Sequence, residues 1–523
     1  MLPSPPPQPG ALDLFPPTRT GKFEVPLDHF RFTVQKRFTL RYAAFEAFAV
    51  NRPKAPVLFY CGNEGALELF YNASGALFEH AKAIQARVFF VEHRYYGHSL
   101  PFGNASFTND ALQWLSIEQA LADYASVLAA LPGILGCVGT GSRQIMGRCD
   151  AILFGGSYGG MLAAWHRLKY PFLSVGAIAS GAPIDFYSKG WRSSASDDAD
   201  DAVQSLFLDA VVQTFETYGR AGGGCGVALR RVLAAADNAT NDELITAGVR
   251  PCHAWRADSV ERYAFYAKGA VADVALVDYP YPTNFIAPLP ANPVQPACEV
   301  LMAGAHSHPH ADVEKLPRAA SLHSLHRAVL GLVNASGDLK CINLQAELVG
   351  QPSRSAVTLS RDPIVQRDVA TRTTSPSVAS SALGVTAWNY QACTELLLEP
   401  LTSDGFGFFP PSRGQIGETR ALCAKTFGIE PRPTWMPLAF GAGQDFGHVA
   451  SNIVFMENDK DPWHIGTRTV PARGGVNGSV VRMVAKGGAH HQDLRFSSAY
   501  DAPDVKKARE VERDAMRRWL SVS

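Results

Sequence analysis

Short apolar runs that end in glycine or polar residues recur along the chain, and they predict buried strands followed by loops. The clearest run, Ala151–Phe154, leads directly into the glycine-rich segment 155–160. Apolar residues at helical spacing come next, at Met161, Leu162, Trp165 and Leu168. This order predicts a strand, a tight turn and a helix within one short stretch.

Three further runs repeat the pattern of a strand followed by a polar loop. Val57–Tyr60 precedes the segment 61–65, Asn452–Met456 precedes 457–463, and Val480–Ala485 precedes 486–495. Open α/β sheets gather the loops after their parallel strands at one edge, where their sites lie. We therefore expect an α/β fold in which these loops meet.

The interval between the first strands and the last two is too long for sheet alone. Within it, Asp200–Tyr218 carries apolar residues at helical spacing, and Val227–Ala235 continues in that style. We expect a helical cap over residues 186–375, inserted between core segments 22–185 and 376–523. The Ser-, Thr- and Arg-rich stretch Ser353–Ser381 is expected to be an exposed loop, and residues 1–21 a Pro-rich disordered lead-in.

Ser157 is the candidate nucleophile, because it lies in a G-x-S-x-G sequence between a predicted strand and a predicted helix. Gly155 and Gly159 flank it where a Cβ atom would collide with the neighbouring strand or helix. The helix N-terminus favours negative charge that develops at this position. The loop after Val57–Tyr60 and the peptide N–H of Tyr158 are expected to form the oxyanion hole, with Asn63 or Glu64 as the second donor.

A serine nucleophile needs a base and an orienting acid, which follow it in the order acid, then histidine, in this class of fold. The loop 457–463 offers Asp459 and Asp461, and the loop 486–495 offers His490 and His491. The residues alone leave both choices open.

Composition excludes several functional classes. The chain has 523 residues, 46% hydrophobic, with 48 basic and 48 acidic side chains, so no net field favours nucleic acid or a charged membrane. No apolar run approaches the ~18 residues of a membrane-spanning helix. His306, His308 and His310 could bind zinc, but Gly304 and Pro309 favour a loop, and serine chemistry needs no metal or cofactor.

The nine cysteines form no C-x-x-C pair and are expected to make disulfides, with Cys61 the unpaired thiol at the end of a buried strand. Sequons occur at Asn72, Asn104, Asn238, Asn334 and Asn477. Both features favour a lysosomal, vacuolar or secreted enzyme. Residues 1–10 show no signal-peptide pattern, so a cytoplasmic enzyme with reduced cysteines is the alternative.

Longer motifs carry a family resemblance. They are Phe23–Phe30, Leu58–Gly65, Phe90–Gly103, Glu118–Tyr124, Gly155–Trp165, Tyr390–Glu395, Asp461–Trp463 and Gly488–Arg495. With them the chain resembles the serine peptidases that include lysosomal Pro-Xaa carboxypeptidase, dipeptidyl peptidase II and thymus-specific serine protease. The resemblance is weak between residues 190 and 387.

The resemblance implies an α/β-hydrolase fold with a large helical cap. It assigns Ser157 as nucleophile, Asp461 as acid and His490 as base, with His491 and Arg495 supporting the base. It also favours disulfides among the six cysteines from Cys225 onward. One departure is that Glu457-Asn458 stands where the family has Asn-Gly, so the acid loop is expected to differ in shape.

The expected substrates are short peptides containing proline, cleaved next to that residue through an acyl-enzyme. Met161 and Trp463 are the candidates for an apolar proline pocket. The first expectation is a Pro-Xaa carboxypeptidase and the alternative is release of Xaa-Pro dipeptides. An esterase or lipase is less favoured because Gly62–Gly65 replaces the HGGG-type loop, and an inactive binding homologue because the triad positions are filled. A homodimer is left open.

Overall fold

The computed structural model describes residues 5–187, 200–218, 224–285, 288–306, 318–333, 340–342, 344, 385–396, 415–432, 434–441 and 443–522. Its strands are β1 Arg19–Pro26, β2 Arg37–Phe45, β3 Val57–Cys61, β4 Arg87–Val91, β5 Ala151–Gly156, β6 Gly176–Ser180, β7 Ile453–Asn458, β8 Arg473–Gly474 and β9 Val480–Ala485.

Within these ranges one sheet has the strand order β1-β2-β4-β3-β5-β6-β7-β9-β8. The six central strands, in the order β4-β3-β5-β6-β7-β9, pair in parallel. At one end β1 and β2, and at the other end β8, pair antiparallel with their neighbours. The carboxyl ends of β3, β5, β7 and β9 therefore lie along one edge, as the apolar runs predicted. The sheet is that of an α/β-hydrolase.

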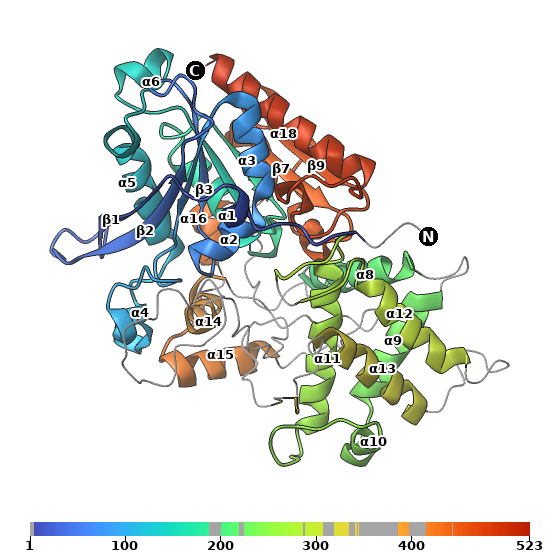
Figure 1. Ribbon diagram of the computed structural model, residues 1–523. Helices are drawn as coiled ribbons and strands as arrows, with labels where there is room; N and C mark the ends of the chain where they lie inside the picture. The colour runs from blue at the N-terminus through green and yellow to red at the C-terminus, as the bar shows by residue number, and fades with distance from the viewer. Residues whose placement is uncertain are drawn as a thin grey trace.

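Helices cover both faces of the sheet (Figure 1). The helices from the start of the chain to the one that follows Ser157 are α1 Ala11–Leu14, α2 Leu67–Ala73, α3 Gly75–Ile84, α4 Asn109–Leu112, α5 Ile117–Leu135, α6 Gly141–Ile145 and α7 Tyr158–Lys169. The last helix of the chain is α18 Pro503–Val522. In β3, Val57 and Phe59 pack with α5 and α7, whereas Leu58 and Tyr60 pack with α2, α3 and α18. Side chains alternate between faces along a strand, so a run that is apolar throughout is buried on both sides.

A second group of helices lies to one side of the sheet, coloured green to yellow in Figure 1. It comprises α8 Asp200–Glu216, α9 Gly224–Asp237, α10 Asn241–Thr246, α11 Ser259–Leu276, α12 Val294–His306 and α13 Arg318–Val333. Their apolar faces share one buried cluster separate from the two sheet faces. This is the helical cap. α9 includes the predicted segment Val227–Ala235, and α8 covers the predicted segment Asp200–Tyr218 except its last two residues. The boundaries 186–375 stay a prediction, and Ser353–Ser381 lies outside the described residues.

The remaining helices return the chain to the sheet. They are α14 Val385–Thr394, α15 Gln415–Phe427, α16 Trp435–Phe440 and α17 Gly443–Val449. Residues of α14 and α15 form a small cluster with Tyr95, Tyr96 and Leu112 from the region after β4. None of the described helices combines the length and the apolar character that crossing a bilayer requires.

The start of the chain differs from the predicted disordered lead-in. Phe15 stacks on Phe78 with ring centroids 5.0 Å apart and makes edge contacts with Phe45 and Phe48. The Gln8 side-chain amide donates to the Phe496 carbonyl over 2.7 Å. Composition misled here, because one aromatic anchor and α1 bind residues 5–21 to the core despite the prolines.

Four disulfides join eight of the nine cysteines, which confirms the expected framework. They are Cys137–Cys149, Cys225–Cys298, Cys252–Cys341 and Cys393–Cys423. Two lie within the cap region and one joins α14 to α15. Cys61 is the free thiol, as predicted, and burial raises the pKa of its thiol.

Candidate active site

Ser157 occupies a strained turn between β5 and α7. Its backbone φ and ψ are 56° and −126°, a conformation that residues other than glycine rarely adopt. The Ser157 N–H donates to the Ser180 carbonyl over 2.8 Å, which fixes the turn against the end of β6. Such a turn projects the side chain away from the sheet at the start of a helix.

The flanking glycines are required by close approach. A Cβ atom at Gly155 would lie 2.0 Å from the carbonyl oxygen of Gly159, and one at Gly159 would lie 2.3 Å from Asn63 Oδ1. Both distances are far below van der Waals contact, so neither position accepts a side chain without displacing the helix or the loop after β3. The steric reason expected for both glycines therefore applies.

His490 and Asp461 meet at the ends of β9 and β7. Asp461 Oδ2 lies 2.6 Å from His490 Nδ1, and both side chains are buried. Asp461 Oδ1 accepts from the Trp463 N–H over 2.9 Å, at the start of the short 3₁₀ helix Pro462–Thr467. Each carboxylate oxygen thus has a donor, which fixes the orientation of the acid.

The alternative acid and base have other partners. Asp459 Oδ1 accepts from the Gly487 N–H over 2.6 Å, and so closes the loop after β9. His491 has a left-handed backbone, φ 35° and ψ 42°, with its ring 4.2 Å from that of His490. Burial, followed by the charges of His490 and Arg495, holds the pKa of His491 well below its usual value. His491 is therefore a neutral ring packed beside His490.

The serine turn lies beside this pair at two points. A Cβ atom at Gly181, directly after β6, would lie 3.0 Å from His490 Nδ1 and 3.1 Å from Asp461 Oδ2. A Cβ atom at Gly156 would lie 3.1 Å from His491 Cδ2. Ser157 follows Gly156, and its N–H is hydrogen-bonded to Ser180, which precedes Gly181. The turn is therefore held against the histidine loop through both neighbouring segments.

The cap supports the histidine loop directly. The His490 N–H donates to the Leu276 carbonyl at the end of α11 over 2.9 Å, and the Tyr279 hydroxyl donates to the His490 carbonyl over 2.8 Å. Arg495 in turn donates to the Tyr279 hydroxyl over 3.0 Å and lies 4.1 Å from the Phe285 ring centroid. Leu276 and Tyr279 were missed from the sequence because they belong to no motif and lie where the family resemblance is weak.

The cap also supports the acid loop. Lys460, next to Asp461, pairs with Asp278 over 2.8 Å, and the Tyr218 hydroxyl donates to the same Asp278 oxygen over 2.6 Å. The other oxygen of Asp278 accepts from the Val294 N–H at the start of α12 over 3.1 Å. Nothing in the local pattern marked Lys460 or Asp278 as more than solvated charges.

The candidate oxyanion loop packs against the serine turn. Asn63 is buried, and its side-chain amide donates to the Gly156 carbonyl over 2.6 Å. Glu64 is half-buried beside it. The Tyr158 hydroxyl meets His93 Nε2 at 3.0 Å and accepts from the Gln391 amide at 2.8 Å. Tyr158 is thereby held by the segment after β4 and by α14 at once.

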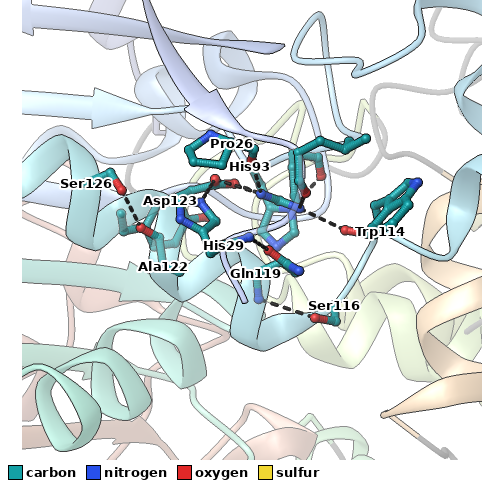
Figure 2. Close-up of polar contacts among 12 residues, drawn as sticks. Pro26, His29, His93, Trp114, Ser116, Gln119, Ala122, Asp123 and Ser126 are labelled. Atoms are coloured by element: carbon teal, nitrogen blue, oxygen red, sulfur yellow. Dashed lines mark hydrogen bonds and ion pairs between the residues drawn. The ribbon is translucent and has the colours of Figure 1, made fainter. Parts of the chain in front are cut away.

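A buried polar network fixes the segment that carries His93. Asp123 of α5 binds Arg94 through two hydrogen bonds of 2.7 Å, and it meets His29 Nε2 at 2.7 Å. Figure 2 shows Asp123, His29 and Gln119 grouped around this segment. Burial opposes the ionised form of Asp123, but Arg94 and His29 outweigh it and lower the pKa of its carboxyl. The network is therefore an ionised, fully paired support of the site rather than reactive chemistry.

The two candidate pocket residues lie in different surroundings. Met161 is 1% exposed and belongs to the core beneath the Ser157 turn, so its side chain is not open to a ligand in this conformation. Trp463 is half-buried between the sheet and the cap, with its ring 5.2 Å from Phe186 and 4.7 Å from Phe207. Of the two, Trp463 is the one positioned where a ligand could reach it.

No group of three or more candidate metal ligands occurs among the residues described. His306 ends α12, while His308 and His310 lie outside that part of the chain.

Comparison with known proteins gives one family. The model for "Serine carboxypeptidase S28" matches residues 25–512. Lysosomal Pro-X carboxypeptidase of Bos taurus is 32% identical over 519 residues, which cover 97% of this chain and 89% of that protein. Thymus-specific serine protease of Mus musculus is 27% identical over 526 residues, covering 96% and 87%.

Among solved structures, proline iminopeptidase of Mycobacterium smegmatis aligns with a TM-score of 0.40 and 10% identity, over 96% of this chain and 99% of that one. Because this likeness is weak, the fold assignment rests on the strand order and on the family match.

Proposed function

The chain belongs to the serine carboxypeptidase S28 family and is a serine-type peptidase, and we propose that it is an exopeptidase that cleaves short peptides next to proline. The observation that carries the proposal is the 2.6 Å contact between His490 Nδ1 and Asp461 Oδ2 beside the strained turn of Ser157. Ser157 is the proposed nucleophile, His490 the proposed base and Asp461 the proposed acid.

The proposed reaction follows from which atoms are already engaged. Asp461 holds the Nδ1–H of His490, which leaves Nε2 to take the proton of the Ser157 hydroxyl as it attacks the substrate carbonyl. The tetrahedral oxygen receives hydrogen bonds from the Tyr158 N–H and from the loop of Asn63 and Glu64. His490 then protonates the leaving amine, and water hydrolyses the acyl-enzyme by the reverse sequence.

The proline ring is proposed to lie on the acyl side, against Trp463. A flat apolar ring suits proline, which is compact and lacks an N–H. Both forms of the exopeptidase, removal of the last residue after proline and release of an Xaa-Pro dipeptide, place proline on this side. They differ only in which charged terminus is anchored.

Paired substrates decide between these two activities. One peptide carries Pro-Xaa with a free carboxylate and a blocked amine, and the other carries Xaa-Pro with a free amine and a blocked carboxylate. We expect cleavage of the first, since the full-length relatives at about 31–32% identity are named Pro-X carboxypeptidases. Cleavage of the second alone supports the dipeptidyl alternative. Equal cleavage of a doubly blocked peptide would overturn the exopeptidase proposal.

An oxidising, acidic compartment is the proposed location. The four disulfides favour the secretory route, and the Bos taurus relative is named as lysosomal. The sequons at Asn104 and Asn477 are exposed and suit glycans. Asn72 is less accessible, because it is half-buried and its side-chain oxygen accepts from the Leu12 N–H over 2.9 Å. Mass loss on enzymatic deglycosylation, reduced by Asn104→Gln and Asn477→Gln together, tests this.

A further inference from the structure

Two buried carboxyl groups lie behind the acid and histidine loops. Asp493 follows His490 in the histidine loop, and Glu512 lies on α18, which packs on one face of the sheet beside β7 and β9 (Figure 1). Both side chains are fully buried, and the two carboxyl groups interact directly with each other. Neither belongs to the proposed catalytic residues.

Direct contact between two carboxyl groups in a dry core requires a proton between them. Asp493 Oδ1 already accepts from the Ser180 hydroxyl over 2.9 Å and from the Asn458 amide over 2.8 Å. Glu512 Oε2 meets His80 Nε2 at 2.9 Å. One oxygen of each group, Asp493 Oδ2 and Glu512 Oε1, has no hydrogen-bond donor among the described residues. Two ionised carboxylates repel each other and have no donor to form a hydrogen bond between them, so one of the two groups holds a proton.

The surrounding charges do not neutralise a second negative charge. Burial lowers the pKa of His80 on α3 to about 3, so its ring is neutral and donates a hydrogen bond without supplying charge. Arg509 on α18 directs its donors to Asp501 and to the carbonyls of residues 492, 493 and 495. The other charged groups that act on this cluster are Arg513 on α18, Glu79 on α3, and Glu457 and Asp461 from β7 and the loop after it.

The same contacts tie the carboxyl pair to every part of the site. Asn458 ends β7 in the turn that leads to Asp461, and Asp493 lies in the turn that follows His490. Ser180, the third partner, accepts the Ser157 N–H with its carbonyl. The Asp493 side chain therefore joins the end of β7, which leads to Asp461, to the end of β6, which holds the turn of Ser157, from within the histidine loop itself.

We propose that Asp493 and Glu512 share one proton and act as positioning residues, which hold the acid and histidine loops in register only while that proton is present. The inference rests on the proposed function in its choice of Asp461 and His490. Loss of the proton places two carboxylates in contact inside a dry core, and their repulsion separates α18 from the histidine loop.

The direction of the pH dependence follows from the titration of the pair. Burial first, then the Glu512 charge, raises the pKa of Asp493 to about 7, and burial raises the pKa of Glu512 to about 7. Their ordinary values are 3.8 and 4.5. The folded chain thus keeps a proton that the unfolded chain has lost, so stability falls as pH rises from about 4 to about 7 and then levels. This suits an enzyme that works in an acidic compartment.

Glu512→Gln provides the sharpest test, because the glutamine amide donates to Asp493 and its oxygen accepts from His80 at every pH. The matched control is Glu510→Gln on the same helix, whose carboxylate is exposed and pairs with Lys507. We expect the ratio of kcat/KM of Glu512→Gln to that of wild type to rise about ten-fold between pH 6 and pH 8, as for loss of one proton with a pKa near 7. Glu510→Gln should keep a constant ratio.

A second readout does not need catalysis. The melting temperature of the inactive Ser157→Ala variant should fall from pH 5 to pH 8. Adding Glu512→Gln to that variant should reduce the fall. Asp493→Asn, which also donates across the pair, serves if Glu512→Gln does not fold. Parallel melting curves for wild type and the amide variant would overturn the shared proton. A changed melting curve with an unchanged kcat/KM ratio would overturn the positioning role. Failure of the proline assignment would leave the melting result intact.

Discussion

Replacing Asp278 by asparagine tests whether the cap holds the acid loop in place. The Asp278 side chain is fully buried, while Lys460 retains 16% exposure. Breaking a buried pair by removing one partner typically costs 3–5 kcal/mol, and we expect about 3 kcal/mol here because the lysine can still reach water. The asparagine side chain keeps the oxygen that accepts from the Val294 N–H, so the start of α12 is preserved.

The catalytic effect follows from the position of Lys460 beside Asp461. A shift of about 1 Å in a catalytic group can cost roughly 10²-fold, so we expect a loss of that order in kcat/KM with little change in KM. The assay is steady-state hydrolysis of the Pro-Xaa peptide, with stability followed by denaturant unfolding. The control is Asp209→Asn, which breaks the exposed cap pair with Arg230 at 3.1 Å and should cost under about 1 kcal/mol.

A double variant refutes or supports the reasoning. Lys460→Met with Asp278→Asn removes both charges, and it should recover most of the stability that the single change loses, because no unpaired buried charge remains. If the double variant is as unstable as Asp278→Asn, the ion pair is not what joins the cap to the acid loop. If Asp278→Asn matches Asp209→Asn in kcat/KM, the pair has no role in placing Asp461.

Three further predictions follow from the site. Ser157→Ala should lower kcat by several orders of magnitude with the melting temperature unchanged, and near-normal turnover would exclude it as nucleophile. His490→Ala should lose about as much as Ser157→Ala and His491→Ala clearly less, measured as kcat/KM; the reverse ranking would make His491 the base. Gly159→Ala should lower kcat by roughly 10²–10³-fold by displacing Asn63, whereas Gly133→Ala, where a Cβ atom meets no atom within 4 Å, should not; equal effects would remove Asn63 from the proposed oxyanion loop.

The strands and the serine turn were predictable because their signals are local. β5 and β9 begin where the apolar runs do, and Gly155 is explained by its close approach to Gly159 across a single turn. Gly159 itself is constrained by Asn63, from the distant loop after β3. Without the family resemblance, the paired acid and histidine could be narrowed only to Asp459 or Asp461 and to His490 or His491. The choice depends on which side chains meet across neighbouring strands, and sequence spacing carries no such information.

The supporting contacts could not be predicted, because each joins residues far apart in the chain. Tyr279 reaches His490, Asp278 reaches Lys460, and Gln391 reaches Tyr158, all from segments inserted between the nucleophile and the acid. The prediction of a disordered lead-in differs from the structure for a related reason. Its proline content describes the local backbone, whereas its position is set by Phe15 packing on Phe78.

These contacts give the cap a role in holding the histidine and acid loops in place. The histidine loop is bonded on one side to the end of α11 and on the other, through Asp493, to α18. Neither contact touches the reacting atoms, yet both lie within a few residues of His490. A movement of the cap or a change in the charge of the Asp493 and Glu512 pair would therefore reach His490, the proposed base, through short connections. The site is thus held jointly by the cap and the last helix, and a variant at either contact should alter kcat more than KM.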